Sequence, residues 1–392
     1  MLTERLEFAH ERDAEIFSAI PAAPAVFLLR GEDAEAEPYV SKTANLRRRL
    51  QRLLGRIEER TRKLNLRDLV RWIEYAPSDS DFESSFVLYQ VLRATFPKTY
   101  SNRLRFRFAP LVKLHLENQY PRASITTRLG RLDRRNVYYG PFLSRVAAEK
   151  FMNDSLDFFK MRRCVDDLHP DPAFPGCIYS EMKMCLAPCF KGCSDQEYSA
   201  EVSRVEAYFD SGGESLAREF STQRAAASAN LAFEEAAAIH VRLEKLKPTM
   251  SQLPEIVRRL DHFSALVIQP CHLADSVNFF RVDRGTIFGP SAFCIQTAEH
   301  AKSQSMESRV QKILDAFQRA KAPLAIATME HLALLKRWYY RSRRVGEIFF
   351  ADGKGVFPTR RIVRGVGRVL RGEGPEEDRS AQNPIGITEL LT

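Results

Sequence analysis

The chain has 392 residues, enough for two to four domains. Hydrophobic residues make up 44% of it, which excludes a globally disordered protein and predicts a sizeable core. Lys and Arg number 59 against 50 Asp and Glu, and the net charge of +9 is compatible with a polyanionic partner. The sequence carries no pattern of a secretory signal or a membrane-spanning helix, and we expect a cytoplasmic protein.

The positive charge is clustered in two places. Seven arginines fall within residues 47–62, and five more lie within residues 360–371. A single charge run is usually a solvated helix face, whereas several runs in one chain favour contacts with phosphates. If about five arginines of the first group touch phosphates, the logarithm of the DNA-binding constant falls with log salt at a slope of roughly −4 to −5.

The first hundred residues predict a small α/β module. Its expected elements are a short charged helix at 1–20, strands at 25–29 and 38–40, a basic helix from Lys42 and a strand at 69–73. A further helix is expected from about Asp81 to Ala94, because Ser80 or Asp81 can serve as its N-cap and Pro97 follows its end.

The next segment alternates apolar and polar residues. It predicts strands at 111–116 and 123–128 and a helix at 145–161. Tyr138, Tyr139 and Phe142 lie close to arginines and could stack on nucleic-acid bases. We expect them to be core residues instead.

Five of the seven cysteines fall within residues 164–193. Such crowding indicates a disulfide framework or a metal centre, and a reducing compartment favours the metal. The gaps separating Cys164, Cys177, Cys185 and Cys189 are twelve, seven and three residues. This series lacks the CxxC pairs of a zinc ribbon. Zinc and an iron–sulfur cluster both accept thiolates, so both stay open on spacing alone.

This series, with Cys-Leu-Ala-Pro-Cys at 185–189, resembles the cysteine cluster of the UvrC family, the incision subunits of bacterial nucleotide excision repair. The resemblance extends through the segments at 120–123, 139–142 and 161–164. It implies a 4Fe–4S cluster with four ligands, Cys164, Cys177, Cys185 and Cys189, and leaves Cys193 as a spare thiol. A structural zinc is the alternative, and we expect a structural role for the centre.

The order of elements before residue 100 resembles the GIY-YIG nuclease module with which this family begins. Tyr39, Lys42 and Arg49 match the second tyrosine, the lysine and the arginine of that module, whose glutamate holds a divalent metal. Phe27 replaces the first tyrosine, and Leu88 stands at the glutamate position. Because leucine cannot ligate a hard cation, we expect a vestigial site.

The arginine-rich helix of the module could still bind DNA. The expected DNA-binding residues are Arg47, Arg48, Arg49, Arg52 and Arg56.

Residues 231–246 resemble the UVR motif, the helical hairpin by which UvrC engages the helicase UvrB. The resemblance implies that a UvrB-like helicase binds through Leu231, Phe233, Glu234, Ala237 and Leu243. A self-contained helical hairpin is the alternative interpretation.

Beyond residue 250, short strands are expected at 265–268, 276–281 and 285–288, with a hairpin turn at 283–285, and helices at 306–319 and 329–341. The ribonuclease-H-type nuclease and helix-hairpin-helix motifs of the family are not recognisable, because Asp315, Asp352 and His331 are scattered.

Together these patterns predict an α+β multidomain protein. Its expected parts are a degenerate GIY-YIG module at 1–105, linker strands and the cysteine cluster at 106–195, a UVR hairpin at 196–250, an α/β domain at 251–350, and a basic segment with a polar tail at 351–392.

Three functions follow as hypotheses. The first is a UvrC-like DNA-binding repair protein with an inactive nuclease site. The second is a metal-dependent DNA endonuclease that uses Mg²⁺ and a rearranged carboxylate such as Glu83. The third is a DNA-binding regulator controlled by the oxidation state of the cluster.

Overall fold

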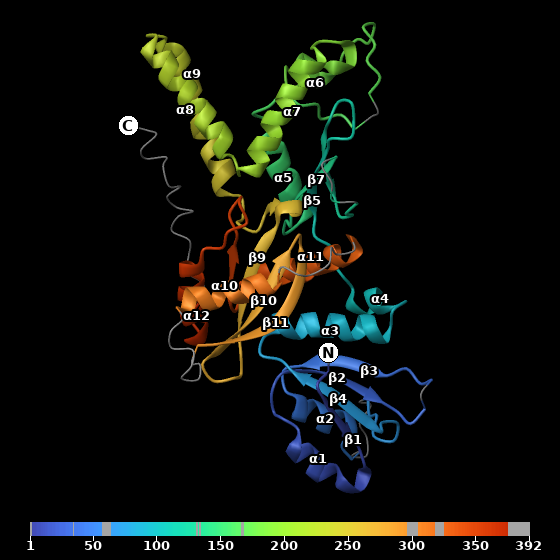
Figure 1. Cartoon of the computed structure of the whole chain (residues 1–392). Helices are drawn as coiled ribbons and strands as arrows, with labels where there is room; N and C mark the ends of the chain where they lie inside the picture. The colour runs from blue at the N-terminus through green and yellow to red at the C-terminus, as the bar shows by residue number, and fades with distance from the viewer. Residues whose placement is uncertain are drawn as a thin grey trace.

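The computed structural model describes residues 2–33, 35–56, 64–130, 132, 135–165, 168–295, 305–317 and 325–374. The chain forms three antiparallel four-stranded sheets with helices around them, a mixed arrangement consistent with the expected α+β class (Figure 1). In the described part of the chain, no helix combines the length and the apolar character needed to cross a membrane.

The first sheet has the strand order β1-β4-β2-β3. Its elements are β1 (Glu4–Glu7), η1 (His10–Arg12), α1 (Asp13–Ala19), β2 (Ala25–Arg30), β3 (Tyr39–Thr43), α2 (Leu46–Leu54), β4 (Trp72–Pro77) and α3 (Asp81–Thr95). Helices α1 and α2 pack with Phe27 and Leu29 on one face, while α3 packs with Val26 and Leu28 on the other. Burial on both faces explains why β2 is a continuous apolar run.

The prediction of a single helix at 1–20 is wrong. Residues 4–7 instead form the edge strand β1, paired with β4, and only residues 13–19 are α-helical. Leu6 and Phe8 of this segment pack in the core of the module. Glu4, Arg5 and Glu7 are exposed on this edge strand, where charge discourages pairing with other chains.

Helix α3 begins as predicted. The Ser80 hydroxyl accepts a hydrogen bond from the Glu83 amide at 3.1 Å and so caps the helix. Val87 and Val91 face the first sheet, whereas Phe82 and Phe86 pack with residues of the C-terminal part. Because α3 is buried from two sides, it belongs to the cores of both parts.

The second sheet has the order β6-β5-β7-β8. It comprises β5 (Leu111–His115), β6 (Ala123–Thr126), β7 (Asn136–Gly140) and β8 (Arg258–Arg259), and it follows α4 (Tyr100–Leu104) and precedes α5 (Arg145–Leu156). Tyr138, Tyr139 and Phe142 are at most 3% exposed, which confirms them as core residues.

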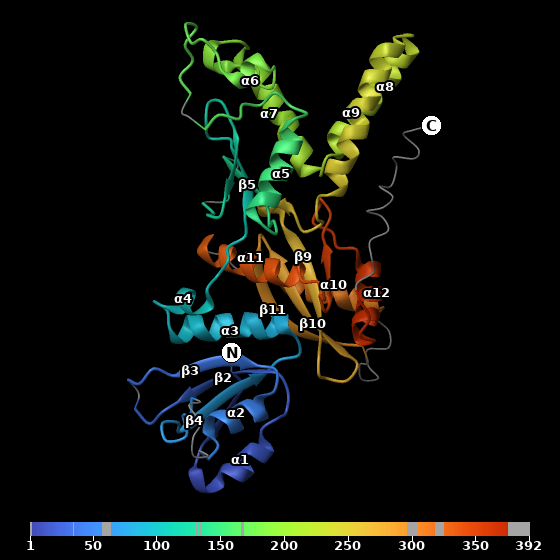
Figure 2. The ribbon, with the colours of Figure 1, turned by 180° about the vertical axis from the view of Figure 1, so that it is seen from behind.

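Two arms project from this middle sheet on the side away from the first sheet (Figures 1 and 2). One holds the cysteine loop with α6 (Ile178–Glu181) and η2 (Pro188–Phe190), and it leads into α7 (Asp195–Asp210). The other is a hairpin of α8 (Glu214–Ala229) and α9 (Phe233–Ser251). Gly212 and Gly213, both with positive φ, make the break between α7 and α8.

The third sheet has the order β11-β10-β9-β12. After η3 (Leu260–His262), it comprises β9 (Ser264–Pro270), β10 (Ser276–Asp283), β11 (Thr286–Cys294) and β12 (Glu347–Phe350), with α10 (Met306–Phe317), α11 (Ala325–Tyr339) and α12 (Thr359–Leu370). The predicted turn is present: Asp283 pairs with Thr286, and Arg284 and Gly285 both have positive φ. Two residues with positive φ give the tight turn that hairpins favour.

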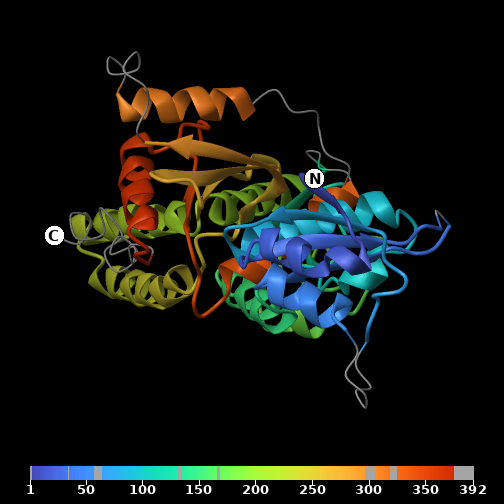
Figure 3. The ribbon, with the colours of Figure 1, turned by 90° about the horizontal axis from the view of Figure 1, so that it is seen from below.

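Helices cover both faces of this sheet. Helices α10 and α12 lie together on one face, and α11 packs with α3 on the other (Figure 3). Residues 351–392 were expected to hold only a basic segment and a polar tail. The arginines near 360–371 instead accompany an amphipathic helix, α12, which buries Ile362, Val366 and Val369. The expected polar tail beyond residue 374 lies outside the described residues.

Candidate functional sites

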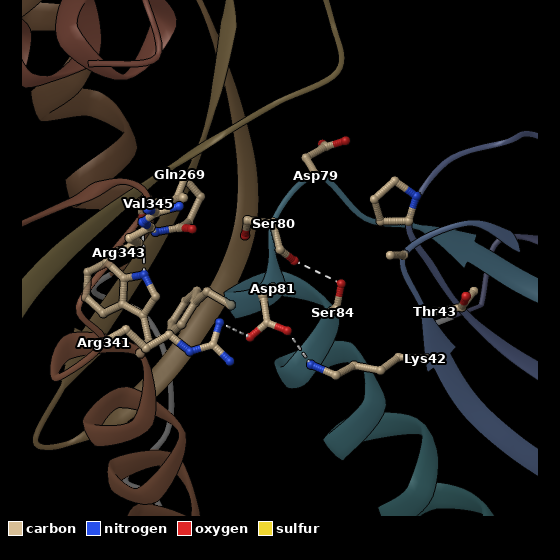
Figure 4. Close-up of a pocket in the computed structure, with 14 residues that line it drawn as sticks. Lys42, Thr43, Asp79, Ser80, Asp81, Ser84, Gln269, Arg341, Arg343 and Val345 are labelled. Atoms are coloured by element: carbon tan, nitrogen blue, oxygen red, sulfur yellow. Dashed lines mark hydrogen bonds and ion pairs between the residues drawn. The ribbon is translucent and has the colours of Figure 1, made fainter. Parts of the chain in front are cut away.

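Lys42 and Asp81 form the centre of the junction between the first sheet and the C-terminal part. The Lys42 Nζ atom donates to Asp81 Oδ1 at 2.6 Å and to Ser85 Oγ at 2.9 Å. Arg341, which lies just after the end of α11, reaches the other oxygen, Oδ2, at 2.7 Å. Figure 4 shows the two cations approaching the carboxylate from opposite sides.

The charge of Asp81 is therefore held between two cations. Partial burial raises the pKa of the Asp81 carboxyl, but Lys42 and Arg341 outweigh that effect and keep this pKa below its usual value. Both carboxylate oxygens have a basic partner, so neither is open to a metal ion. Asp81 was not predicted as a site residue. Its spacing gives a signal, because Asp81 lies seven residues before Leu88 on α3 and therefore on the same face of the helix.

Leu88 lines a cavity of about 470 Å³ together with Lys42. Beside six apolar residues, five of its lining residues are basic: Lys42, Arg105, Arg107, Lys336 and Arg337. Among the described residues that line this cavity, none is Asp or Glu. Burial, with the neighbouring Arg107, lowers the pKa of Lys336, as expected where cations are crowded. The position expected for a metal-binding glutamate thus faces a basic cavity.

Tyr39 and Arg49 meet on the opposite face of the first sheet. The Arg49 guanidinium donates to the Tyr39 hydroxyl at 2.8 Å, and the Phe27 ring centroid lies 6.0 Å from that of Tyr39. Tyr39 packs against the core formed with α2, whereas Lys42 and Leu88 lie on the α3 side. The structure therefore divides the predicted vestigial residues into two pairs.

Glu83 does not join either pair. It is 6% exposed, and its Oε2 atom accepts hydrogen bonds from the Asp79 amide at 3.0 Å and from Asn278 Nδ2 at 3.4 Å. Burial raises the pKa of its carboxyl. Glu83 thus faces β10 and does not line the cavity that contains Leu88.

The five arginines expected to bind DNA have two kinds of surroundings. Arg47 donates to the backbone carbonyls of Ile20 and Ser18 at 2.8 and 3.2 Å, and Arg49 is bound to Tyr39. The remaining three, Arg48, Arg52 and Arg56, are exposed. Arg48 and Arg52 are four residues apart on α2 and therefore share one face of the helix, whereas Arg56 follows its end.

The cysteine loop holds the four predicted ligands. Burial, with a smaller effect of the thiols of Cys164, Cys189 and Cys177, raises the pKa of Cys185 to about 11. Two N–H groups point at sulfur: Arg162 donates to Cys164 Sγ at 3.4 Å, and the Ala187 amide donates to Cys185 Sγ at 3.3 Å. Such bonds to sulfur are a common feature of iron–sulfur sites.

The spacing of the sulfur atoms bears on the kind of metal centre. All seven cysteines are among the described residues, and within that part of the chain no three of them place their sulfurs within 4.8 Å of one another. Thiolates on one tetrahedral zinc lie about 3.8 Å apart, given Zn–S bonds of about 2.3 Å. Cys193 packs against the neighbouring core.

The α8–α9 hairpin exposes apolar side chains at its tip. Leu231 is 72% exposed and Phe233 65%, and Glu234 and Ala237 are also exposed. Leu243, by contrast, is buried against α8. Val241 extends the exposed face one turn beyond Ala237. Four of the five predicted partner-binding residues are thus accessible to a partner, and the fifth is a core residue of the hairpin.

The scattered C-terminal candidates stay apart. His331 is buried and its Nδ1 accepts a hydrogen bond from the Ile287 amide at 2.9 Å, while Asp352 accepts from the amides of its own turn. Asp315 pairs with Gln311 on α10. In the described part of the chain these three residues form no metal-binding group.

Comparison with known proteins agrees with the geometry of the middle part. Residues 110–208, which run from β5 into α7 and include the four predicted ligands, match the model of the UvrC/Cho excinuclease middle domain. No solved structure matches the chain.

Curated relatives extend the match to other parts of the chain. The UvrABC system protein C of Rickettsia canadensis is 26% identical over 67% of this chain and 41% of its own length. Those of Rickettsia bellii and a Geobacter species are each 24% identical, over 74% and 59% of this chain and 44% and 35% of their own lengths. The chain thus spans less than half the length of these relatives. With the middle-domain match, these similarities relate the chain to UvrC-type proteins.

Proposed function

We propose that this protein binds DNA in nucleotide excision repair and that its GIY-YIG-like module does not cleave DNA. The observation that carries the proposal is the basic cavity around Leu88. Among the described residues that line it, five are cations and none is a carboxylate, which suits a phosphate group and offers Mg²⁺ no acidic ligand.

The charge arrangement next to this cavity supports the same conclusion. A nuclease of this kind needs a metal to offset charge on the leaving oxygen. Asp81, the acid bound to Lys42, is already paired on both oxygens, and Glu83 faces away toward Asn278. Lys42 and the cavity cations would hold a phosphodiester in place, but no described group there would hold the metal.

A cleavage assay tests the proposal. The full-length protein is incubated with nicked, damaged and branched DNA in Mg²⁺ or Mn²⁺, beside the Lys42→Ala and Arg49→Ala variants. We expect no metal-dependent product from any of them and weaker DNA binding by Lys42→Ala. Cutting by the wild type that disappears in Lys42→Ala would instead establish the endonuclease hypothesis.

We also propose that Cys164, Cys177, Cys185 and Cys189 hold a 4Fe–4S cluster. The convergence of four thiols, their spacing and the N–H groups aimed at two of the sulfurs support it. When bound, the cluster would supply four metal–thiolate bonds that fix a loop with little core of its own. Zinc is the alternative occupant.

Anaerobically purified protein distinguishes the two occupants. We expect about four irons and four sulfides per chain and a brown colour, both lost in Cys185→Ser. Cys193→Ser is the matched control, since Cys193 lies in the same loop and packs against the core, and it should keep the colour. Colourless protein with one equivalent of zinc would replace the cluster with a zinc site.

Finally, we propose that the α8–α9 hairpin binds a UvrB-like helicase through its exposed tip. Leu231, Phe233 and Val241 present apolar surface there without burying it within the chain. Such residues are typical anchors of an interface. In a pull-down with purified UvrB-type helicase, Phe233→Ala should weaken capture, whereas Ala225→Ser on the exposed surface of α8 should not. Equal capture by both variants would point to a self-contained hairpin.

A further inference from the structure

Asp79, Cys271 and His272 come together at the contact between two distant loops. Asp79 lies in the connection from β4 to α3, and the other two residues follow β9. One potential ligand atom from each residue lies within 4.8 Å of the other two. His272 Nδ1 is 2.9 and 3.0 Å from the two oxygens of Asp79, and the Cys271 sulfur lies beside the same carboxylate.

The surroundings hold Asp79 in place. Asn278 Nδ2 donates to Asp79 Oδ2 at 3.3 Å, and the Asp79 amide donates to the buried carboxylate of Glu83. The Asp79 side chain is only 11% exposed, while that of His272 is 66% exposed. Figure 4 shows the Asp79 carboxylate directed away from Lys42 and Asp81, and none of the three residues of this cluster lines the basic cavity.

The donor set has a specific chemistry. Sulfur, imidazole nitrogen and carboxylate oxygen together suit zinc and its neighbours among the transition metals, whereas Mg²⁺ and Ca²⁺ prefer oxygen alone. With zinc bonds of about 2.0–2.3 Å, tetrahedral ligands lie about 3.3–3.6 Å apart. The three atoms need to move by little to reach that geometry. Exposure of His272 leaves one side open for a water ligand.

We propose that Asp79, Cys271 and His272 bind a thiophilic divalent metal ion, with zinc as the expected occupant, and that this ion clamps the β4–α3 connection to the third sheet. The ion would also balance the negative charge of the two carboxylates, Asp79 and Glu83, that share this corner. An outer hydrogen bond such as that from Asn278 orients a ligating carboxylate and raises metal affinity. The site is far from the cysteine loop, which lies on the opposite side of the middle sheet (Figure 1).

Metal binding to the full chain tests the proposal. Protein treated with chelator is titrated with Co²⁺, whose thiolate charge-transfer absorption reports sulfur ligation, and then with Zn²⁺. Because the cysteines of 164–189 can also take these ions, the readout is a difference between variants. Wild type should bind one equivalent more than Cys271→Ser or His272→Ala, and Asn278→Ala should bind that equivalent about tenfold more weakly.

Two controls keep the result unambiguous. Cys294→Ser removes another cysteine of the same sheet and should bind as much metal as wild type. Zn²⁺ should raise the melting temperature of wild type and of Cys294→Ser more than that of His272→Ala, whose exposed side chain can be removed without loss of core packing. Equal stoichiometry and equal melting shifts in wild type and His272→Ala would overturn the site. This outcome is independent of DNA binding, nuclease activity and the iron content of the cysteine loop.

Discussion

The basic helix α2 makes a quantitative prediction that separates structural arginines from DNA-binding ones. Five arginines at about 0.9 per phosphate contact would give a salt slope of −4 to −5. The structure shows Arg47 bound to two carbonyls and Arg49 to Tyr39. Only Arg48, Arg52 and Arg56 are exposed, so α2 and the residues just after it should contribute about −2.7.

The perturbation is the double variant Arg48→Ala/Arg52→Ala. Removing two phosphate contacts should make the slope less negative by about 1.8. Between 50 and 200 mM salt, the affinity of the wild type should therefore change about twelvefold more than that of the variant. Fluorescence anisotropy of a labelled duplex over this range measures both slopes. Other basic regions contribute equally to both proteins, so the difference isolates the helix.

Two further variants decide whether the reasoning holds. Arg12→Ala removes an exposed arginine of the same module that is paired with Glu15, and it should leave the slope unchanged. Arg47→Ala should lower the free energy of unfolding by about 1–3 kcal/mol, because two carbonyls lose a charged donor, and should change the slope little. An unchanged slope in the double variant, or an equal change in Arg12→Ala, would refute DNA binding through α2.

Three other predictions concern stability. Glu347 is 4% exposed and accepts two hydrogen bonds from Arg368, at 2.6 and 2.8 Å. Glu347→Ala should lower the free energy of unfolding, measured in urea, by about 3–5 kcal/mol, because the Arg368 cation loses this carboxylate in a site with little solvent. Burial lowers the pKa of His331 to about 4, so the folded state binds fewer protons than the unfolded state between about pH 6.5 and 4. The free energy of unfolding should therefore fall by about 3 kcal/mol as the pH drops through this window, and by less in His331→Gln. In the hairpin, replacing the buried Leu243 by Ala should lower the free energy of unfolding, measured with heat or urea, by about 2–5 kcal/mol. Replacing the exposed Val241 by Ala should change it by no more than about 0.5 kcal/mol.

Local sequence signals predicted those parts of the fold that depend on neighbouring residues. Ser80 caps α3 because its hydroxyl reaches an amide three residues later, and the Arg284–Gly285 turn depends on the conformations of two residues. The edge strand β1 was missed since its pairing partner, β4, lies far along the chain and its own residues are mostly charged. Helix α12 was not predicted, because its many arginines indicate a charged segment and obscure the helical spacing of its buried apolar residues.

The candidate sites show the same limit. Sequence spacing and the family resemblance predicted the four cysteine ligands, and that role stays a prediction. The sequence could not identify Asp81 as the partner of Lys42, since the second cation on this carboxylate, Arg341, comes from the distant segment after α11. The sequence also could not show that Asp79 lies beside Cys271 and His272, because Asp79 follows a strand of the first sheet and the other two follow a strand of the third sheet. Residues far apart in sequence meet only through the way α3 packs.

In the proposed function, Leu88 stands at the position expected to hold a metal ligand, and the packing of helix α3 places cations around that position. In this chain α11 covers α3 and brings Arg337 and Lys336 to the cavity beside Lys42. A glutamate placed at position 88 would meet these cations at short range, and a carboxylate paired with them would gain little from binding Mg²⁺. The surroundings of the site are thus already suited to an anion. This supports DNA binding, not cleavage, as the role of the module, and it makes the packing of α3 against α11 the structural basis of that role.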